Sequence, residues 1–167
     1  MYDELTEVDI KKMQEEIDHR VRVLRPQLIE EVQTTRAFGD LSENFEYKCA
    51  KQAKNRNESR IRYLERMIRT AKVIEVKGRE DAVGLFDKVT IFNEMVKKEM
   101  TIQIVTTLRQ DALKGLISKE SPVGKALMGH KVGERLCVEV DPSHKYFVEI
   151  RAIEKGFDDE SLDISTY

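Results

Sequence analysis

The sequence has no tryptophan, only three prolines and two cysteines, and no apolar run longer than a few residues. Cys49 and Cys137 form no CxxC pair and the three histidines are scattered, so a reducing compartment and no structural zinc are expected. The first residues, "MYDELTEVDIKK", are acidic and lack the apolar core of a signal peptide. These absences argue against a membrane protein and predict a cytoplasmic one.

Overall charge identifies no partner. The chain has 29 basic and 31 acidic side chains among 167 residues, which leaves a formal net charge of -2. Charged residues make up 36% and apolar residues 40% of the chain. This composition is typical of a soluble globular protein, with enough apolar material for a modest core in one domain or two small ones.

The first half has apolar residues at helical spacing. They recur in steps of three and four at Ile10, Met13, Ile17, Val21, Leu24, Leu28 and Val32, which indicates one helix with a single apolar stripe. The pattern resumes at Ala50 and continues to Ala71. Folding the chain back near residue 41 pairs Val32 with Ala50 and Met13 with Ile68. This predicts a long antiparallel coiled-coil hairpin of roughly 40 Å.

One proline lies inside the first predicted helix. Pro26 lacks an amide hydrogen, which favours a kink at this point. In the predicted register Asn57 lies opposite Arg25 and Pro26. Its side chain can therefore satisfy a carbonyl that the proline frees, or lie in solvent at the edge of the stripe.

The second half has the period of β-strands. β-Branched and aromatic residues alternate with others or cluster in "DKVTIF", "MTIQIVT", "RLCVEV" and "YFVEIRAI". Turn formers such as "DPSHK" separate these stretches. Between these stretches "SPVGKALMG" predicts a short helix with Ser121 as its N-cap and Pro122 at its first position.

The predicted fold class is therefore α+β, with a helical hairpin followed by a small, mostly antiparallel β domain that carries one short helix. We expect the hairpin over residues 1–76, with an acidic tip near 39–46, and a linker over 77–82. The β domain is expected over 83–156, and an acidic flexible tail over 157–167.

Three acids lie at the break between the predicted helices. "AFGDLSENFEYKCA" places Asp40, Glu43 and Glu46 three residues apart. One interpretation is a capping box, in which Asp40 accepts hydrogen bonds from first-turn amides and Glu43 reaches back. The other is that acids on one helix face share a cation. Two carboxylates cannot hold magnesium alone, so such a pair would complete a metal site on another molecule.

The second helix is basic. Residues 47–72 hold nine bases against two acids, and residues 3–18 hold seven acids against two bases. The bases from Arg62 to Lys72 are expected to pair across the hairpin. Nearer the tip the first helix offers only Glu30 and Glu31. The bases there are candidates for binding a nucleic-acid backbone, although a solvated helix face is the alternative. These candidates are Lys48, Lys51, Lys54, Arg56 and Arg60.

Several segments resemble the Gre-factor family of bacterial transcript cleavage factors. "GDLSENFEYKCAK" is similar to the family's tip signature, G-D-L-x-E-N-x-E-Y followed by small and basic residues. "RPQLIEEVQTTRAFGD" and "RIRYLERMIRTAKVIEV" resemble its two hairpin helices. "GLISKESPVGKALMGHKVGE" resembles its I-S-x-x-S-P-x-x-x-A-L-x-G-K segment. The resemblance covers roughly residues 8 to 155.

The resemblance implies an accessory factor, not an enzyme. A hairpin of this kind enters the secondary channel of a stalled bacterial RNA polymerase, and Asp40 and Glu43 would help to hold Mg²⁺ at the polymerase active site. The factor would have no cofactor of its own. The basic tip face would hold the 3′ end of the backtracked nascent RNA. An FKBP-like second domain, including Ser121 and Pro122, would dock on the polymerase, and the factor would be a monomer.

Two departures accompany the resemblance. "IVTTLRQDALKGLIS" replaces a family segment that is usually acidic, of the V-G-x-D-E-A-D kind, and the residues from Phe157 onward have no counterpart. An inhibitor that enters the same channel without stimulating cleavage is an alternative. A prolyl isomerase is a further one, but the second half has few aromatic residues to line its pocket.

Overall fold

The computed structural model describes residues 3–39 and 44–166. Contacts divide these residues into two units. The hairpin unit consists of residues 10–71, and the sheet unit combines residues 3–9 with residues 72–166. Within the described residues no helix is both long enough and apolar enough to cross a membrane.

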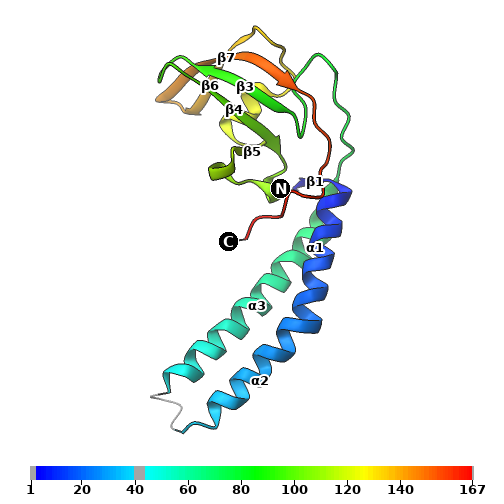
Figure 1. The fold of residues 1–167 in the computed structure, drawn as a ribbon, viewed down its shortest axis with the longest axis vertical. Helices are drawn as coiled ribbons and strands as arrows, with labels where there is room; N and C mark the ends of the chain where they lie inside the picture. Colours follow the sequence, from blue (N-terminus) through cyan, green and yellow to red (C-terminus); the bar gives the residue numbers. More distant parts are fainter. Residues whose placement is uncertain (1–2, 40–43, 167) are drawn as a thin grey trace. The chain divides into compact units, whose positions relative to one another are not determined.

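The hairpin unit confirms the predicted helical hairpin (Figure 1). Its first arm comprises α1 (Glu7–His19), one π-helical segment (Arg20–Leu24) and α2 (Arg25–Arg36). Its second arm is α3 (Phe45–Thr70). The apolar side chains that the two arms bury come from the predicted stripe. They include Met13, Ala50, Ile61 and Leu64.

The π-helical segment precedes the proline. The Arg25 amide donates to the Arg20 carbonyl, five residues back instead of four, and Pro26, which has no N–H to donate, follows directly in the first turn of α2. Asn57 is buried, and its Nδ2 donates to the same Arg20 carbonyl at 3.3 Å. Asn57 thus contacts a backbone carbonyl of the first arm, as one of the two expectations had it, but this carbonyl already accepts from Arg25 and is not one that Pro26 leaves free. Arg25 itself pairs with Glu58, the neighbour of Asn57, at 2.7 Å.

The sheet unit contains a five-stranded sheet. The strands are β3 (Lys88–Asn93), β4 (Lys98–Val105), β5 (Leu116–Ser118), β6 (Arg135–Asp141) and β7 (His144–Glu154), in the order β5-β4-β3-β7-β6. The four strands expected from sequence are all present. The β4–β5 pair is parallel and the others are antiparallel, so the sheet is mixed.

The helix α4 (Pro122–Leu127) lies beside this sheet, and the Ser121 hydroxyl caps it by accepting from the Gly124 amide at 3.0 Å. Gly124 packs against the Ser118 carbonyl so closely that a Cβ there would lie 2.2 Å from that oxygen. The core of the unit includes Phe86, Leu127 and Ile150.

Four short elements complete the sheet unit. The strands β1 (Glu4–Leu5) and β2 (Lys72–Val73) pair in parallel. Two 3₁₀ turns (Thr107–Arg109 and Ala112–Lys114) lie within the segment "IVTTLRQDALKGLIS". None of these four elements was expected from the sequence.

The last described residues also contact the sheet unit. Leu162 packs against the core, and the Ser165 amide donates to the Leu108 carbonyl at 2.7 Å. The sequence predicts a flexible tail over 157–167, whereas Leu162 and Ser165 are held by the sheet unit.

Candidate functional site

The connection between α2 and α3 carries the candidate metal-assisting acids. Asp40 and Glu43 lie outside the described residues. The residue that caps α3 is Asn44, whose backbone is extended (φ -78°, ψ 93°) and whose Oδ1 accepts from the Tyr47 amide at 3.0 Å. The helix α3 therefore takes its N-cap from Asn44. The capping-box interpretation concerns Asp40 and Glu43, so it lies outside the described residues and stays a prediction.

The same asparagine ties the two helices together. Its Nδ2 donates to the Thr35 carbonyl at 2.7 Å, and the Phe38 amide donates to this carbonyl at 3.1 Å. Thr35 is itself buried, and its hydroxyl donates to the Glu31 carbonyl at 2.8 Å. One carbonyl group thus fixes the chain on both sides of residues 40–43.

The five basic candidates fall into two groups. Lys48, Lys51 and Arg56 are exposed and Lys54 is half-buried. Arg60 is buried instead, and its Nε and Nη2 donate to the two carboxylate oxygens of Glu16 at 2.9 Å and 3.1 Å.

The expectation that Arg60 lacks an acidic partner was therefore wrong. Its physical reason is the helix period, because Arg60 lies on the face of α3 that the first arm covers. Burial by itself would raise the pKa of Glu16. Hydrogen bonds from Arg60 and Arg20 outweigh that effect and hold the pKa below its usual value. This carboxylate stays ionised near neutral pH and binds the two arms together.

Within residues 3–39 and 44–166, no group of three or more histidine, cysteine, aspartate or glutamate side chains is placed to hold a metal ion. The expected Mg²⁺ ligands, Asp40 and Glu43, are both outside those ranges. Sharing of Mg²⁺ with a polymerase therefore stays a prediction.

The expected docking residues have a structural role in the sheet unit. The Ser121 hydroxyl donates to the Ser118 carbonyl at 2.7 Å in addition to capping α4, and Pro122 is exposed at the first position of that helix. These contacts explain why serine and proline occupy the turn. Whether they contact a polymerase stays a prediction.

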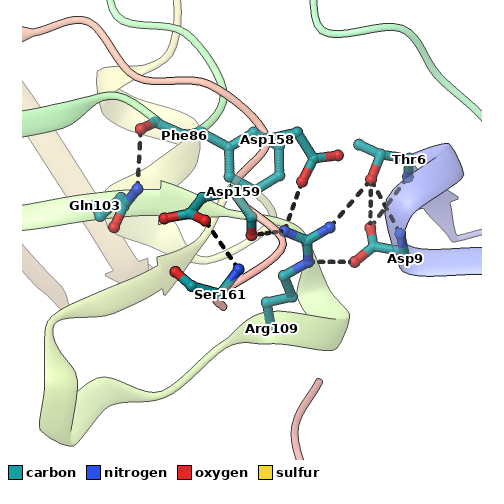
Figure 2. Close-up of polar contacts among 8 residues, drawn as sticks. All are labelled: Thr6, Asp9, Phe86, Gln103, Arg109, Asp158, Asp159 and Ser161. Carbon is teal, nitrogen blue, oxygen red and sulfur yellow. Dashed lines mark hydrogen bonds and ion pairs between the residues drawn. The ribbon is translucent and has the colours of Figure 1, made fainter. Parts of the chain in front are cut away.

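A buried arginine in the sheet unit was missed by sequence reasoning (Figure 2). Arg109 is fully buried, and its Nε donates to Asp9 Oδ1 at 2.6 Å. Its Nη1 forms an ion pair with Asp158 Oδ1 at 2.6 Å and donates to the Asp159 carbonyl at 3.2 Å. The guanidinium also lies 5.0 Å from the centre of the Phe86 ring, within the range of a cation–π contact.

The Arg109 cluster joins the two segments in which the sequence is expected to depart from the family that it resembles. Arg109 lies in "IVTTLRQDALKGLIS", and Asp158 lies in the stretch that begins at Phe157. The sequence held one signal for part of this cluster, because Thr6 and Asp9 have the spacing of a capping box. The Thr6 amide donates to Asp9 Oδ2 at 3.0 Å, and the Asp9 amide lies 3.3 Å from the Thr6 hydroxyl that accepts its hydrogen.

Comparison with known proteins identifies relatives for both halves of the chain. Residues 4–73 match the family described as "Transcription elongation factor, N-terminal", and residues 78–155 match "Transcription elongation factor, GreA/GreB, C-term". The chain is 40% identical over 150 residues to the transcription elongation factor GreA of Mesoplasma florum, an alignment that covers 89% of this chain and 96% of that protein.

A second relative gives the same result. The GreA protein of Caldanaerobacter subterraneus is 42% identical over 137 residues, covering 81% of this chain and 87% of that protein. Among solved structures, the GreA factor homolog 1 (Gfh1) of Thermus thermophilus aligns with 93% of this chain and 100% of its own, at 26% identity and a TM-score of 0.42.

Proposed function

The chain belongs to the GreA/GreB family of transcription elongation factors, and from this membership we propose that its hairpin enters the secondary channel of bacterial RNA polymerase and stimulates cleavage of backtracked RNA. It is an accessory factor of transcription, so the polymerase supplies the active site. The proposal concerns how this chain contributes to that site.

The observation that carries the proposal is the construction of the hairpin end. The chain leaves α2 at Arg36 and enters α3 at Phe45, and the Thr35 carbonyl fixes both sides of the connection. Asp40 and Glu43 fall within this short connection. A rigid hairpin lowers the entropic cost of presenting two carboxylates to another molecule.

Magnesium explains why the acids would act only inside a polymerase. The ion prefers six oxygen ligands in octahedral geometry and gives up water reluctantly. Asp40 and Glu43 supply too few carboxylates for a complete site. Within the polymerase, the enzyme and the RNA would provide the remaining oxygen ligands. Mg²⁺ held at the completed site would supply a water activated for attack on the RNA.

The basic residues at the start of α3 would hold the extruded RNA 3′ segment. Lys48, Lys51 and Arg56 are exposed and suited to phosphate contacts, and Lys54 is half-buried beside them. Arg60 is not part of this proposed surface, because its guanidinium is engaged by Glu16. One copy of the factor would dock on the polymerase through the segment that contains Ser121 and Pro122.

Stalled, backtracked elongation complexes test the proposal. We expect Asp40→Asn and Glu43→Gln each to abolish stimulated RNA cleavage while polymerase binding is retained, because each change removes a charge and keeps the side-chain size. Glu46→Gln is the matched control, since this neighbouring acid has no proposed metal role. Cleavage that survives both changes, or a wild-type protein that blocks the complexes without cleavage, would contradict the proposal.

A further inference from the structure

Two phenylalanines flank the connection between α2 and α3 and are exposed. Phe38, which follows α2, has 64% of its surface accessible, and Phe45, the first residue of α3, has 75%. Single exposed apolar residues are ordinary on protein surfaces. Two large aromatic side chains at the same end of a narrow hairpin call for a different explanation, because neither stabilises the core.

The backbone holds these two residues close together. The Phe38 amide donates to the Thr35 carbonyl, and Asn44, which directly precedes Phe45, donates its Nδ2 to the same oxygen. Because one carbonyl oxygen binds both segments, the two aromatic residues lie on either side of one anchored point.

Positive charge lies next to the second phenylalanine. Lys48 is three residues after Phe45 in α3, so the two side chains share a helix face. Lys48 and Lys51 are both exposed. An aromatic ring beside exposed ammonium groups matches the chemistry of single-stranded nucleic acid, in which flat bases alternate with phosphates.

We propose that Phe38 and Phe45 form a stacking platform for unpaired bases of the RNA 3′ segment, while Lys48 and Lys51 contact its phosphates. The inference rests on the proposed function, since it names the part of the RNA that the hairpin end would hold. Stacking tolerates any base sequence, because every base has a π face. A factor that must act on any stalled transcript requires that tolerance.

Phenylalanine-to-alanine variants provide the first test. The apparent affinity of the full-length protein for backtracked complexes should fall about five- to a hundredfold in Phe45→Ala, as the loss of one stacked base predicts. Phe45→Tyr should restore binding because it keeps a ring, and Phe45→Leu should not. Phe38→Ala should behave like Phe45→Ala. Ile29→Ala is the control, because Ile29 is also exposed in the hairpin unit but lies on α2.

RNA chemistry separates stacking from contact with protein. Complexes whose extruded 3′ segment carries abasic sugars should bind the wild type as weakly as Phe45→Ala, and the variant should lose nothing further. An equal loss in Phe45→Ala on normal and abasic RNA would show that the ring contacts the polymerase, which would overturn the inference.

Photocrosslinking gives a readout that does not depend on cleavage. RNA with 5-iodouridine in the extruded segment should crosslink to the wild type and lose that crosslink in the double variant Phe38→Ala/Phe45→Ala. Unchanged crosslinking in the double variant would overturn the stacking platform. A wild type that crosslinks in this way but stimulates no cleavage would count against the proposed cleavage function alone.

Discussion

The hairpin unit and the sheet unit each bury one arginine against carboxylates, but they do so differently. The Arg109 side chain is fully buried, and its partners Asp9 and Asp158 come from opposite ends of the chain. Arg60 pairs with Glu16, which faces it from the other arm of the hairpin and also binds Arg20.

The difference shows that the cost of removing a charge depends on what it leaves behind. A buried carboxylate without a partner keeps its full desolvation penalty, whereas a partly exposed one with a second partner does not. The two clusters should therefore respond unequally to the same substitution. The exposed lysines of α3, which leave no buried partner, should respond least.

Arg109→Gln should have the largest effect on stability. It leaves Asp9 without its charge partner in the interior, so the free energy of unfolding of the sheet unit should fall by about 3–5 kcal/mol. Hydrogen exchange at the amides of β3, β4 and β7 measures this. Arg135→Gln is the control, because its pair with Glu94 is exposed and should be worth less than about 1 kcal/mol. Equal effects of the two substitutions would contradict the comparison.

Truncation after Gly156 should have the second largest effect. It removes Asp158 and the Leu162 contact but leaves Asp9 paired with Arg109, and water gains access to the guanidinium. We expect the sheet unit to lose about 2 kcal/mol of stability. Asp158→Asn keeps the rest of the tail and should lose less. If truncation left the exchange of the sheet amides unchanged, the tail would have no part in the fold.

Arg60→Gln should lower the free energy of unfolding of the hairpin by a smaller amount, about 1–2 kcal/mol. The effect is smaller because Glu16 keeps its hydrogen bond from Arg20. Thermal unfolding followed by helical circular dichroism measures the hairpin directly. Arg62→Gln is the control, since Arg62 is exposed two residues further along α3. A loss as large as that of Arg109→Gln would show that burial does not set the difference between the two clusters.

Acid should weaken the hairpin through Glu16. Its pKa in the folded protein lies below the reference value of 4.5. The ionised carboxylate therefore stabilises the fold above about pH 4.5, and this contribution is lost as pH falls through that value towards the lower folded pKa. Glu16→Gln should unfold with a weaker dependence on pH in this window. An unchanged acid profile would assign the pH dependence to other carboxylates.

The same comparison explains how far the sequence could be interpreted. The apolar stripe, the four main strands and the Ser121 cap depend on neighbours within a few residues, and each was predicted correctly. The Arg109 cluster joins residues that are 100 positions apart, as Arg109 and Asp9 are. No local pattern specifies such a pair.

Arg60 illustrates an error of a different kind. Its place in the helical period was available from the sequence, because Asn57, Ile61 and Leu64 define the inner face of α3. Charge count alone grouped it with the exposed lysines. Periodicity and charge must therefore be considered together before a basic residue is assigned to a binding surface.

The smallest effect on stability is expected from replacing Lys48, Lys51 and Lys54 together by glutamine. Lys48 and Lys51 are exposed and Lys54 is only half-buried, so removal of their charges leaves no carboxylate stranded in the interior. The free energy of unfolding should change by less than about 0.5 kcal/mol.

The effect of this triple substitution on RNA binding should be much larger than its effect on stability. Each phosphate contact on a single strand contributes about 0.7 to the slope of log affinity against log salt concentration. Loss of three contacts should make that slope less steep by about 2, because fewer counterions are released on binding. Titrations of backtracked complexes at several salt concentrations measure the slope. An unchanged slope would mean that the lysines only form a solvated helix face. Exposed charge at this end of α3 would then contribute neither to stability nor to RNA binding.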